Sequence, residues 1–319
     1  MKNLNNKILI GVLAGLLVVF ALSRIFRSSR LQRSLPETLV QVDTAKVDAI
    51  RLHPVAESGA ALEFSKKGNT WTVAKGNIQA DVEKHVIETV LSYFVRMTPQ
   101  KLVSTKKERW SEFAVGDSST RVAVLSGGKT VAELFIGRTG FSQSATSPNP
   151  YGMGGFGASF TYVRNVGDNE VYSVDGFLES AFNRSFDDWR NKSLLKLKSS
   201  EVTRIQFNYP DSGFVAEKKN GRWVVNDLPA DSVRIKEYLS GLEFKNGSSF
   251  ADDFNSSSVP DLSLVINGSK GELASVKAWK READFVLNSS LQPKVYFSSA
   301  STSLVSTLFP GKAALAARK

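Results

Sequence analysis

Early in the chain, apolar and polar residues alternate on both sides of a turn signal. Leu62 and Phe64 alternate with polar neighbours, Gly68-Asn69 follows, and the alternation resumes at Trp71 and Val73. Two alternating runs around a Gly/Asn pair are typical of a β-hairpin, because both residues accept the positive φ angles of a tight turn. The pattern predicts a hairpin with its apolar face turned to a core.

The period then changes from two residues to that of a helix. Asp81 precedes apolar residues that recur three and four positions apart, namely Val82, Val86, Ile87, Val90, Leu91 and Phe94. Such a stripe predicts an amphipathic helix. Since an Asp carboxylate can accept hydrogen bonds from the free amides of a first helical turn, Asp81 is predicted to be its N-cap.

The same signals return in the second half of the chain. Asn220-Gly221 replaces Gly68-Asn69, Trp223 replaces Trp71, and Asp231 stands before a second helical stripe, as Asp81 does before the first. We interpret Trp71, Asp81, Trp223 and Asp231 as markers of a structural repeat. A ligand-stacking role for the two tryptophans is the alternative, but their apolar alternation favours core positions.

The remaining elements follow in the same order in both halves. Hairpins are predicted around Gly127-Gly128 and Asn267-Gly268, and apolar helical stripes follow at residues 174–182 and 304–309. The expected fold class is α+β, with an N-terminal transmembrane helix and two tandem repeats of antiparallel hairpins with amphipathic helices. The repeats are placed at residues 45–190 and 191–312, and residues 313–319 are expected to form a frayed tail.

An apolar run lies close to the N-terminus. Residues 8–22, from Ile8 through Leu16 to Leu22, are all apolar or Gly. The run is shorter than the roughly 20 residues of a typical bilayer span, but Ile25 and Phe26 extend it if Arg24 reaches the interface. We expect a membrane anchor within residues 1–27 and a stalk at 28–44, and a cleaved signal peptide is the alternative.

The sequence also bears on the cellular location. The absence of cysteine excludes disulfides, Cys-based zinc sites and a lipid-modified N-terminal Cys, and it is compatible with a place outside the cytoplasm. We expect a single-pass inner-membrane protein with its large domain in the periplasm. The flanking charges argue against this orientation, because four Arg follow the apolar run and two Lys precede it.

The net charge of +10 raises the question of nucleic-acid binding. Six of the basic residues lie in the first 33 positions, which contain no acid, so the remaining chain carries 10 − 6 = +4 without a long basic run. The excess positive charge is therefore mostly N-terminal, and we expect no nucleic-acid partner.

A stretch rich in Gly, Ser and Pro occupies residues 137–159. It lacks the Gly-Lys-Ser/Thr ending of a phosphate-binding loop. Its aromatic residues Phe141, Tyr151 and Phe156 make it a candidate partner-contact loop, although a hairpin loop without further function is the simpler interpretation.

Candidate catalytic groups are few. His53 ends a predicted strand, His85 lies on the polar side of the first helix, and Asp187-Asp188 is an acidic pair between the repeats. No Gly-x-Ser-x-Gly motif accompanies the histidines, and they are not spaced as a metal pair. An ion pair with Arg190 or Lys192, or a solvated turn, is the default for the acidic pair. We expect no catalytic, cofactor or metal site, and an enzyme with a cleft around Asp187, Asp188 and His85 is the alternative.

Several of these motifs together resemble a known family. They are the N-terminal apolar segment, Gly-x-x-Trp-x-Val followed by Ala-Asp, Tyr-Val-Arg with Val-Tyr at residues 162–172, an aromatic-Arg-Asn-Lys-x-Leu-Leu joint at 189–195, and a second Asn-Gly-x-Trp with Ala-Asp. The chain resembles an uncharacterised family of membrane-anchored bacterial proteins that accompany gliding-motility-type ABC-2 export systems. The resemblance covers nearly the whole chain and carries no catalytic residues.

This resemblance implies an extracytoplasmic accessory subunit beside a permease, an ATPase and a large auxiliary protein. We therefore expect a non-enzymatic, membrane-anchored accessory or scaffold subunit of an ABC-type export system, with the membrane and the transporter's permease or auxiliary subunits as partners. The alternative is an independent cell-envelope module that binds glycan or peptide through the Gly-rich loop.

Overall fold

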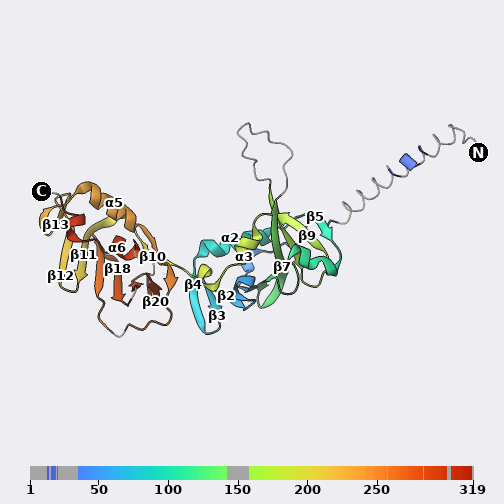
Figure 1. Ribbon diagram of the computed structural model, residues 1–319, viewed down its shortest axis with the longest axis horizontal. Coiled ribbons are helices and arrows are strands. Elements are labelled where there is room, and N and C mark those ends of the chain that lie inside the picture. The colour runs from blue at the N-terminus through green and yellow to red at the C-terminus, as the bar shows by residue number, and fades with distance from the viewer. Residues whose placement is uncertain are drawn as a thin grey trace, which may run out of the picture. The chain divides into compact units, whose positions relative to one another are not determined.

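The chain divides into two compact units. The computed structural model describes residues 13, 16–18, 20, 35–141, 158–256, 258–282, 284–299 and 303–317. The first unit, unit 1, comprises Met1–Arg190 and the second, unit 2, comprises Asn191–Lys319. Most of the labelled elements of each unit are strands (Figure 1).

Unit 1 is built on a nine-stranded antiparallel sheet with the order β4-β3-β2-β1-β6-β7-β8-β9-β5. The predicted hairpin is present, because β2 and β3 pair on either side of Gly68-Asn69. The strands are β1 (Ala49–His53), β2 (Leu62–Lys67), β3 (Thr70–Lys75), β4 (Ile78–Val82), β5 (Pro99–Ser104), β6 (Thr120–Ser126), β7 (Lys129–Phe141), β8 (Ser159–Asn165) and β9 (Val171–Asp175).

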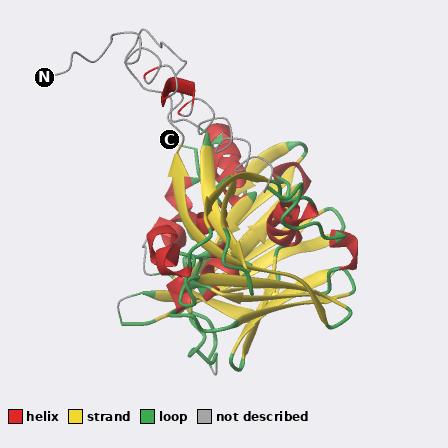
Figure 2. Ribbon diagram, turned by 90° about the vertical axis from the view of Figure 1, so that its right-hand side faces the viewer, coloured by secondary structure: helices red, strands yellow, loops and turns green. Residues whose placement is uncertain are grey.

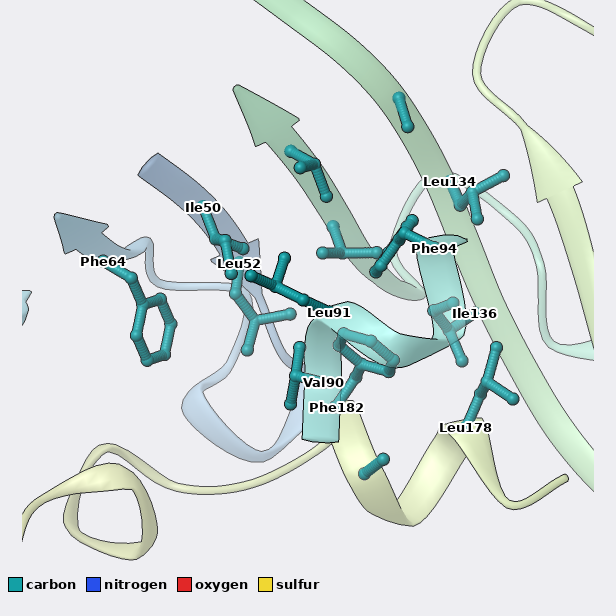
Figure 3. Packing of buried hydrophobic residues seen from close by; sticks show 14 of the residues in the cluster. Ile50, Leu52, Phe64, Val90, Leu91, Phe94, Leu134, Ile136, Leu178 and Phe182 are labelled. Carbon is teal, nitrogen blue, oxygen red and sulfur yellow. The ribbon is translucent and has the colours of Figure 1, made fainter. Parts of the chain in front are cut away.

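Three helices supply side chains to the main core of unit 1, and the shortest of them contributes Phe186 and Trp189. Helix α2 (Lys84–Val95) buries Ile87, Val90, Leu91 and Phe94, and helix α3 (Leu178–Phe182) buries Leu178, Ala181 and Phe182. Figure 3 shows these helices packed against apolar side chains of the central strands, among them Leu52, Leu134 and Ile136. The short elements are η1 (Thr44–Lys46), η2 (Val55–Glu57) and α4 (Phe186–Trp189).

A smaller cluster includes Phe135, which lies between the main-core residues Leu134 and Ile136 on β7. Because neighbouring side chains of a strand point to opposite faces, this cluster lies on the other face of the sheet. It includes Trp110 from helix η3 (Lys107–Phe113). The Arg164 guanidinium lies 3.6 Å from the centroid of Trp110 and donates to the Val115 carbonyl at 2.9 Å. Burial lowers the pKa of Arg164.

Unit 2 has a nine-stranded sheet with the same order of equivalent strands, β14-β13-β12-β11-β17-β18-β19-β20-β16. These strands are β11 (Val202–Tyr209), β12 (Ser212–Lys219), β13 (Arg222–Val225), β14 (Leu228–Pro229), β16 (Ser249–Phe250), β17 (Leu262–Gly268), β18 (Gly271–Lys280), β19 (Phe285–Ser289) and β20 (Gln292–Ser298). A separate two-stranded sheet pairs β10 (Ser193–Lys196) with β15 (Phe244–Asn246).

The core of unit 2 includes side chains from helix α5 (Ser232–Leu242) and helix α6 (Ser303–Leu308). Helix η4 (Ser199–Glu201) precedes β11, and helix η5 (Lys312–Ala314) follows α6. The expectation of a frayed tail is wrong for residues 313–317. Leu315 is buried, Ala316 pairs with Ala230, and Ala317 donates to the Pro229 carbonyl.

The expected fold class needs correction. Antiparallel β-sheets dominate both units, as the abundance of strands in Figure 2 shows, so the expected α+β class is wrong. Among the residues that the structure describes, no helix is long and apolar enough to cross a bilayer. Leu16 is helical, while Ile8 and Leu22 lie outside the described residues. The apolar run itself is shorter than a usual span.

The predicted helix cap at Asp81 is also wrong. Asp81 lies in β4, where it pairs with Thr72, and α2 begins at Lys84 after Glu83. A short edge strand therefore occupies the position that the helical pattern assigned to the first turn. In unit 2, by contrast, the Asp231 carboxylate accepts from the amides of Val233 and Arg234, as an N-cap does.

Candidate functional site

The candidate site is the end of unit 1 from which the Gly-rich segment leaves the sheet. Strand β7 ends at Phe141 and β8 begins at Ser159, and these two residues pair with each other. The adjacent pair is Gly140 with Phe160. A Cβ atom on Gly140 would lie 2.5 Å from the Phe160 ring, so only glycine allows the ring to cover the strand here.

Hydrogen bonds fasten the start of helix α3 to these two strands. The Thr161 hydroxyl donates to the Gly176 carbonyl at 2.6 Å and accepts from the Leu178 amide at 3.0 Å. The Thr139 amide donates to Glu179 Oε2 at 3.0 Å. Because two of these hydrogen bonds hold the first residues of α3 and the third holds Gly176, the residue just before α3 has a defined place beside the end of β7.

That residue is Phe177, and together with Phe141 it forms what we term the aromatic pair. The ring centroids lie 6.0 Å apart with an interplanar angle of 61°, an edge-to-face arrangement. Phe141 is 53% exposed and Phe177 is 49% exposed. Two exposed rings on a hydrogen-bonded base can bind an apolar or planar group, and they supply no acid, base or nucleophile.

Of the three predicted contact residues, the structure places Phe141 at this site, whereas Tyr151 and Phe156 lie outside the described residues. Phe177 was missed, because its spacing to Ala181 assigned it to the buried stripe of the following helix. A signal was available in Gly176, whose φ of 99° ends the strand and leaves Phe177 ahead of the helix.

The repeat markers have structural positions. Trp71 is buried in the main core of unit 1, and Trp223 is half-buried against the core of unit 2. Each stands in the second strand of its hairpin, paired with Lys66 and Lys218 respectively. The interpretation of the two tryptophans as core residues is therefore confirmed for Trp71, and Trp223 packs at the margin of its core.

The structure does not gather the titratable candidates into one cluster. The His53 ring shares a hydrogen bond with the Gly59 carbonyl at 3.0 Å, whereas the largely exposed His85 faces Glu83 at 3.1 Å. Asp187 accepts from Arg190 at 3.2 Å, as the default interpretation of the acidic pair predicts. Within the described residues, no group of three or more His, Asp or Glu side chains is placed to hold a metal ion.

A family model matches part of the chain. Residues 152–262 match the model of a domain of unknown function, DUF4340. The matched range begins before β8 in unit 1 and ends at the start of β17 in unit 2, so it covers about a third of the chain. This part of the chain is thus similar to a family whose function is not characterised. No curated protein and no solved structure shows significant similarity to it.

Proposed function

We propose that this protein is a non-enzymatic accessory or scaffold subunit of an ABC-type export system, that it works outside the cytoplasm, and that it holds a transporter subunit at the aromatic pair. The single observation that carries the proposal is the exposure of Phe141 and Phe177 side by side at the base of the Gly-rich segment. Aromatic residues are enriched at the centres of protein interfaces.

The base of the site supports a role in binding. Because Thr139 and Thr161 are hydrogen-bonded to residues in and beside α3, the two rings are held before a partner arrives. A preorganised surface loses less conformational entropy on association, and more of the buried area then contributes to affinity.

The type of partner comes from the resemblance stated above. Proteins of that kind accompany a permease, an ATPase and an auxiliary protein, and the matched domain of unknown function is compatible with an accessory role.

The test is affinity purification of the full chain from detergent-solubilised membranes. Fully burying a Phe side chain is worth about 1.5–3 kcal/mol, and since each ring is already about half covered, the F141A/F177A double variant should lose about 2 kcal/mol, roughly thirtyfold in Kd. Transporter subunits should copurify with the wild type and be depleted with the double variant. The control is Phe244→Ala, because Phe244 is an exposed aromatic of unit 2.

Recovery of the same transporter subunits with wild type and double variant would refute the role of the aromatic pair. Recovery of the wild-type protein alone would refute the accessory function.

A second candidate function rests on the same pair of rings. Exposed aromatic faces can also stack on sugars, as an independent module for cell-envelope glycan or peptide would require. In that case purified protein should bind envelope glycan or peptide with no transporter present, and the double variant should abolish that binding.

A further inference from the structure

Unit 2 contains an apolar pocket of about 430 Å³ at the end of its sheet, beside helix α6. We term it the α6 pocket. Its apolar walls are formed by side chains of four elements and of the residue that follows α6. These side chains are Tyr209, Leu262, Phe285, Val305 and Phe309. Small-molecule sites typically enclose roughly 300–1,000 Å³ and have mainly apolar walls.

The duplication makes it possible to find the equivalent place in unit 1. Leu262 pairs with Ala278 at the start of β17, as Thr120 pairs with Ile136 at the start of β6. Thr120 is therefore the counterpart of Leu262. The same register continues from β18 to its neighbour β19 in unit 2 and from β7 to its neighbour β8 in unit 1. Phe285 of β19 therefore corresponds to Thr161 of β8.

The helix residues can be matched through the last backbone hydrogen bond of each helix. The Asn183 amide donates to the Glu179 carbonyl at 2.7 Å, and the Phe309 amide donates to the Val305 carbonyl at 2.8 Å. Glu179 and Asn183 are thus the counterparts of Val305 and Phe309. Four polar residues of unit 1 are replaced by four apolar residues in unit 2.

In unit 1 these four polar side chains close the junction between sheet and helix. Thr120 accepts from the Val55 amide at 3.3 Å and Asn183 accepts from the Ala56 amide at 2.8 Å. Glu179 and Thr161 join β7 and β8 to α3, as described above. Leucine, phenylalanine and valine cannot make such bonds, so in unit 2 the same junction has become an apolar pocket.

Two tyrosines hold the pocket open on its helical side. The Tyr209 hydroxyl donates to the Pro310 carbonyl at 2.6 Å, and the Tyr238 hydroxyl donates to the Leu308 carbonyl at 2.9 Å. These bonds connect β11 and α5 to the end of α6. The pocket is therefore formed before any ligand enters, which lowers the entropy lost on binding.

The charged residues that line the pocket balance one another. Lys280 and Arg281 are opposed by Glu282 and Asp284. Arg281 Nε lies 3.1 Å from Asp284 Oδ1, and the Ser298 hydroxyl donates to the same carboxylate at 2.5 Å. Two positive and two negative groups line the pocket. A charged head group would be attracted by the two groups of opposite charge and repelled by the two of like charge, so its charge would add little to the binding free energy.

We propose that the α6 pocket binds a small single-chain amphiphile whose alkyl or aryl body enters between Phe285 and α6 and whose uncharged polar head stays among the charged groups. The walls select the apolar body, the balanced charges select the neutral head, and the volume suits a small molecule. This inference is independent of the transporter and of the aromatic pair.

The first experiment is isothermal titration of the full chain with 1-hexanol, 1-heptanol and 1-octanol. Burial of each added methylene should tighten Kd by about fourfold. Nonanoate and octylammonium, which carry the octyl tail of octanol with opposite charges, should bind no more tightly than octanol. An affinity that does not change with chain length would overturn the proposal, and so would a clear preference for either charged head.

The second experiment uses variants that restore the residues of unit 1. Phe285→Thr removes an apolar wall and Val305→Glu places a charge inside the pocket, so each should weaken octanol binding by about tenfold or more. Phe244→Thr is the matched control, because Phe244 is exposed in unit 2 and does not line the pocket. It should leave Kd unchanged.

Far-ultraviolet circular dichroism must show that each variant is folded. If Phe285→Thr does not fold, Val305→Glu tests the pocket in its place. Octanol affinity that is unchanged in both folded pocket variants, or equally lost in the control, would place the binding elsewhere and overturn the proposal.

Discussion

Removal of the Asp231 carboxylate should loosen helix α5, whereas the same change at Asp81 should leave helix α2 unaffected. The two residues have the same place in the repeated sequence pattern, but only Asp231 is an N-cap. Its Oδ1 accepts from the amides of Val233 at 3.0 Å and Arg234 at 3.1 Å. Asp81 is an exposed residue of an edge strand.

The magnitude follows from these contacts. Loss of an Asp N-cap costs about 0.5–2 kcal/mol. Asp231 Oδ2 also lies 3.6 Å from Arg234 Nε, and a partly exposed ion pair of this kind adds at most about 1 kcal/mol. Asp231→Ala should therefore destabilise α5 by about 1–2 kcal/mol. Asp81→Ala removes no helix contact and should change the stability of α2 by no more than about 0.5 kcal/mol.

Amide hydrogen exchange followed by mass spectrometry can measure the two helices separately in the full chain. Peptides that cover residues 231–242 should exchange about five- to thirtyfold faster in Asp231→Ala, since 1.4 kcal/mol is a factor of ten. Peptides that cover residues 84–95 should exchange at the wild-type rate in Asp81→Ala. Equal acceleration of both helices would show that Asp81 caps α2 and would refute the assignment of residues 78–82 to a strand.

Three further predictions concern stability. Arg164→Lys should destabilise unit 1 by about 2–3 kcal/mol in urea unfolding, because lysine cannot reproduce the planar contact with the buried aromatic rings, whereas the exposed Arg138→Lys should be neutral. Gly137→Ala should cost more than about 2 kcal/mol, because the new Cβ would lie 2.2 Å from a backbone oxygen of η3, and Gly116→Ala, which meets nothing within 4 Å, should cost little. Burial raises the pKa of Tyr209 to about 12, above its ordinary value of 10.0, so the free energy of unfolding should fall as the pH rises from about 10 to 12. Tyr209→Phe should make that fall less steep. An unchanged dependence of the unfolding free energy on pH would contradict the assignment of the fall to Tyr209.

Local patterns were sufficient to predict several elements of both units. Gly68-Asn69 and Asn220-Gly221 form the turns of their hairpins because each pair contains a residue that accepts positive φ, and Gly68, Asn220 and Gly221 do so in the structure. The core face of α2 follows from its helical spacing. Such features depend on residues that are close in sequence.

Other features depend on contacts that no local pattern contains. Residues 78–82 form a strand because they pair with β3, although Val82 fits the helical stripe. Hairpin pairing continues through Asn267-Gly268 to Gly271, so the turn lies two residues later than the Asn-Gly signal indicates. The strand β5 pairs with the distant β9, and its sequence has no clear alternation.

The candidate site was predictable only in part. Phe141 stands out as an aromatic residue within a Gly-rich stretch, whereas its neighbour Phe177 comes from a segment 36 positions later and meets it through the β7–β8 pairing and the hydrogen bonds of Thr161. The α6 pocket was not predictable, because its walls come from strands and a helix that are far apart in the sequence.

The central claim, that the aromatic pair contacts a transporter subunit, is tested most directly by site-specific photo-crosslinking in intact cells. A photoreactive phenylalanine analogue at Phe141 and, in a separate strain, at Phe244 replaces two exposed aromatic residues. A crosslinked product should form between position 141 and a subunit of the export system, identified by mass spectrometry, and none should form from position 244. Crosslinking of that subunit from position 244 alone, or its absence from position 141 in cells that contain the whole export system, would refute the contact.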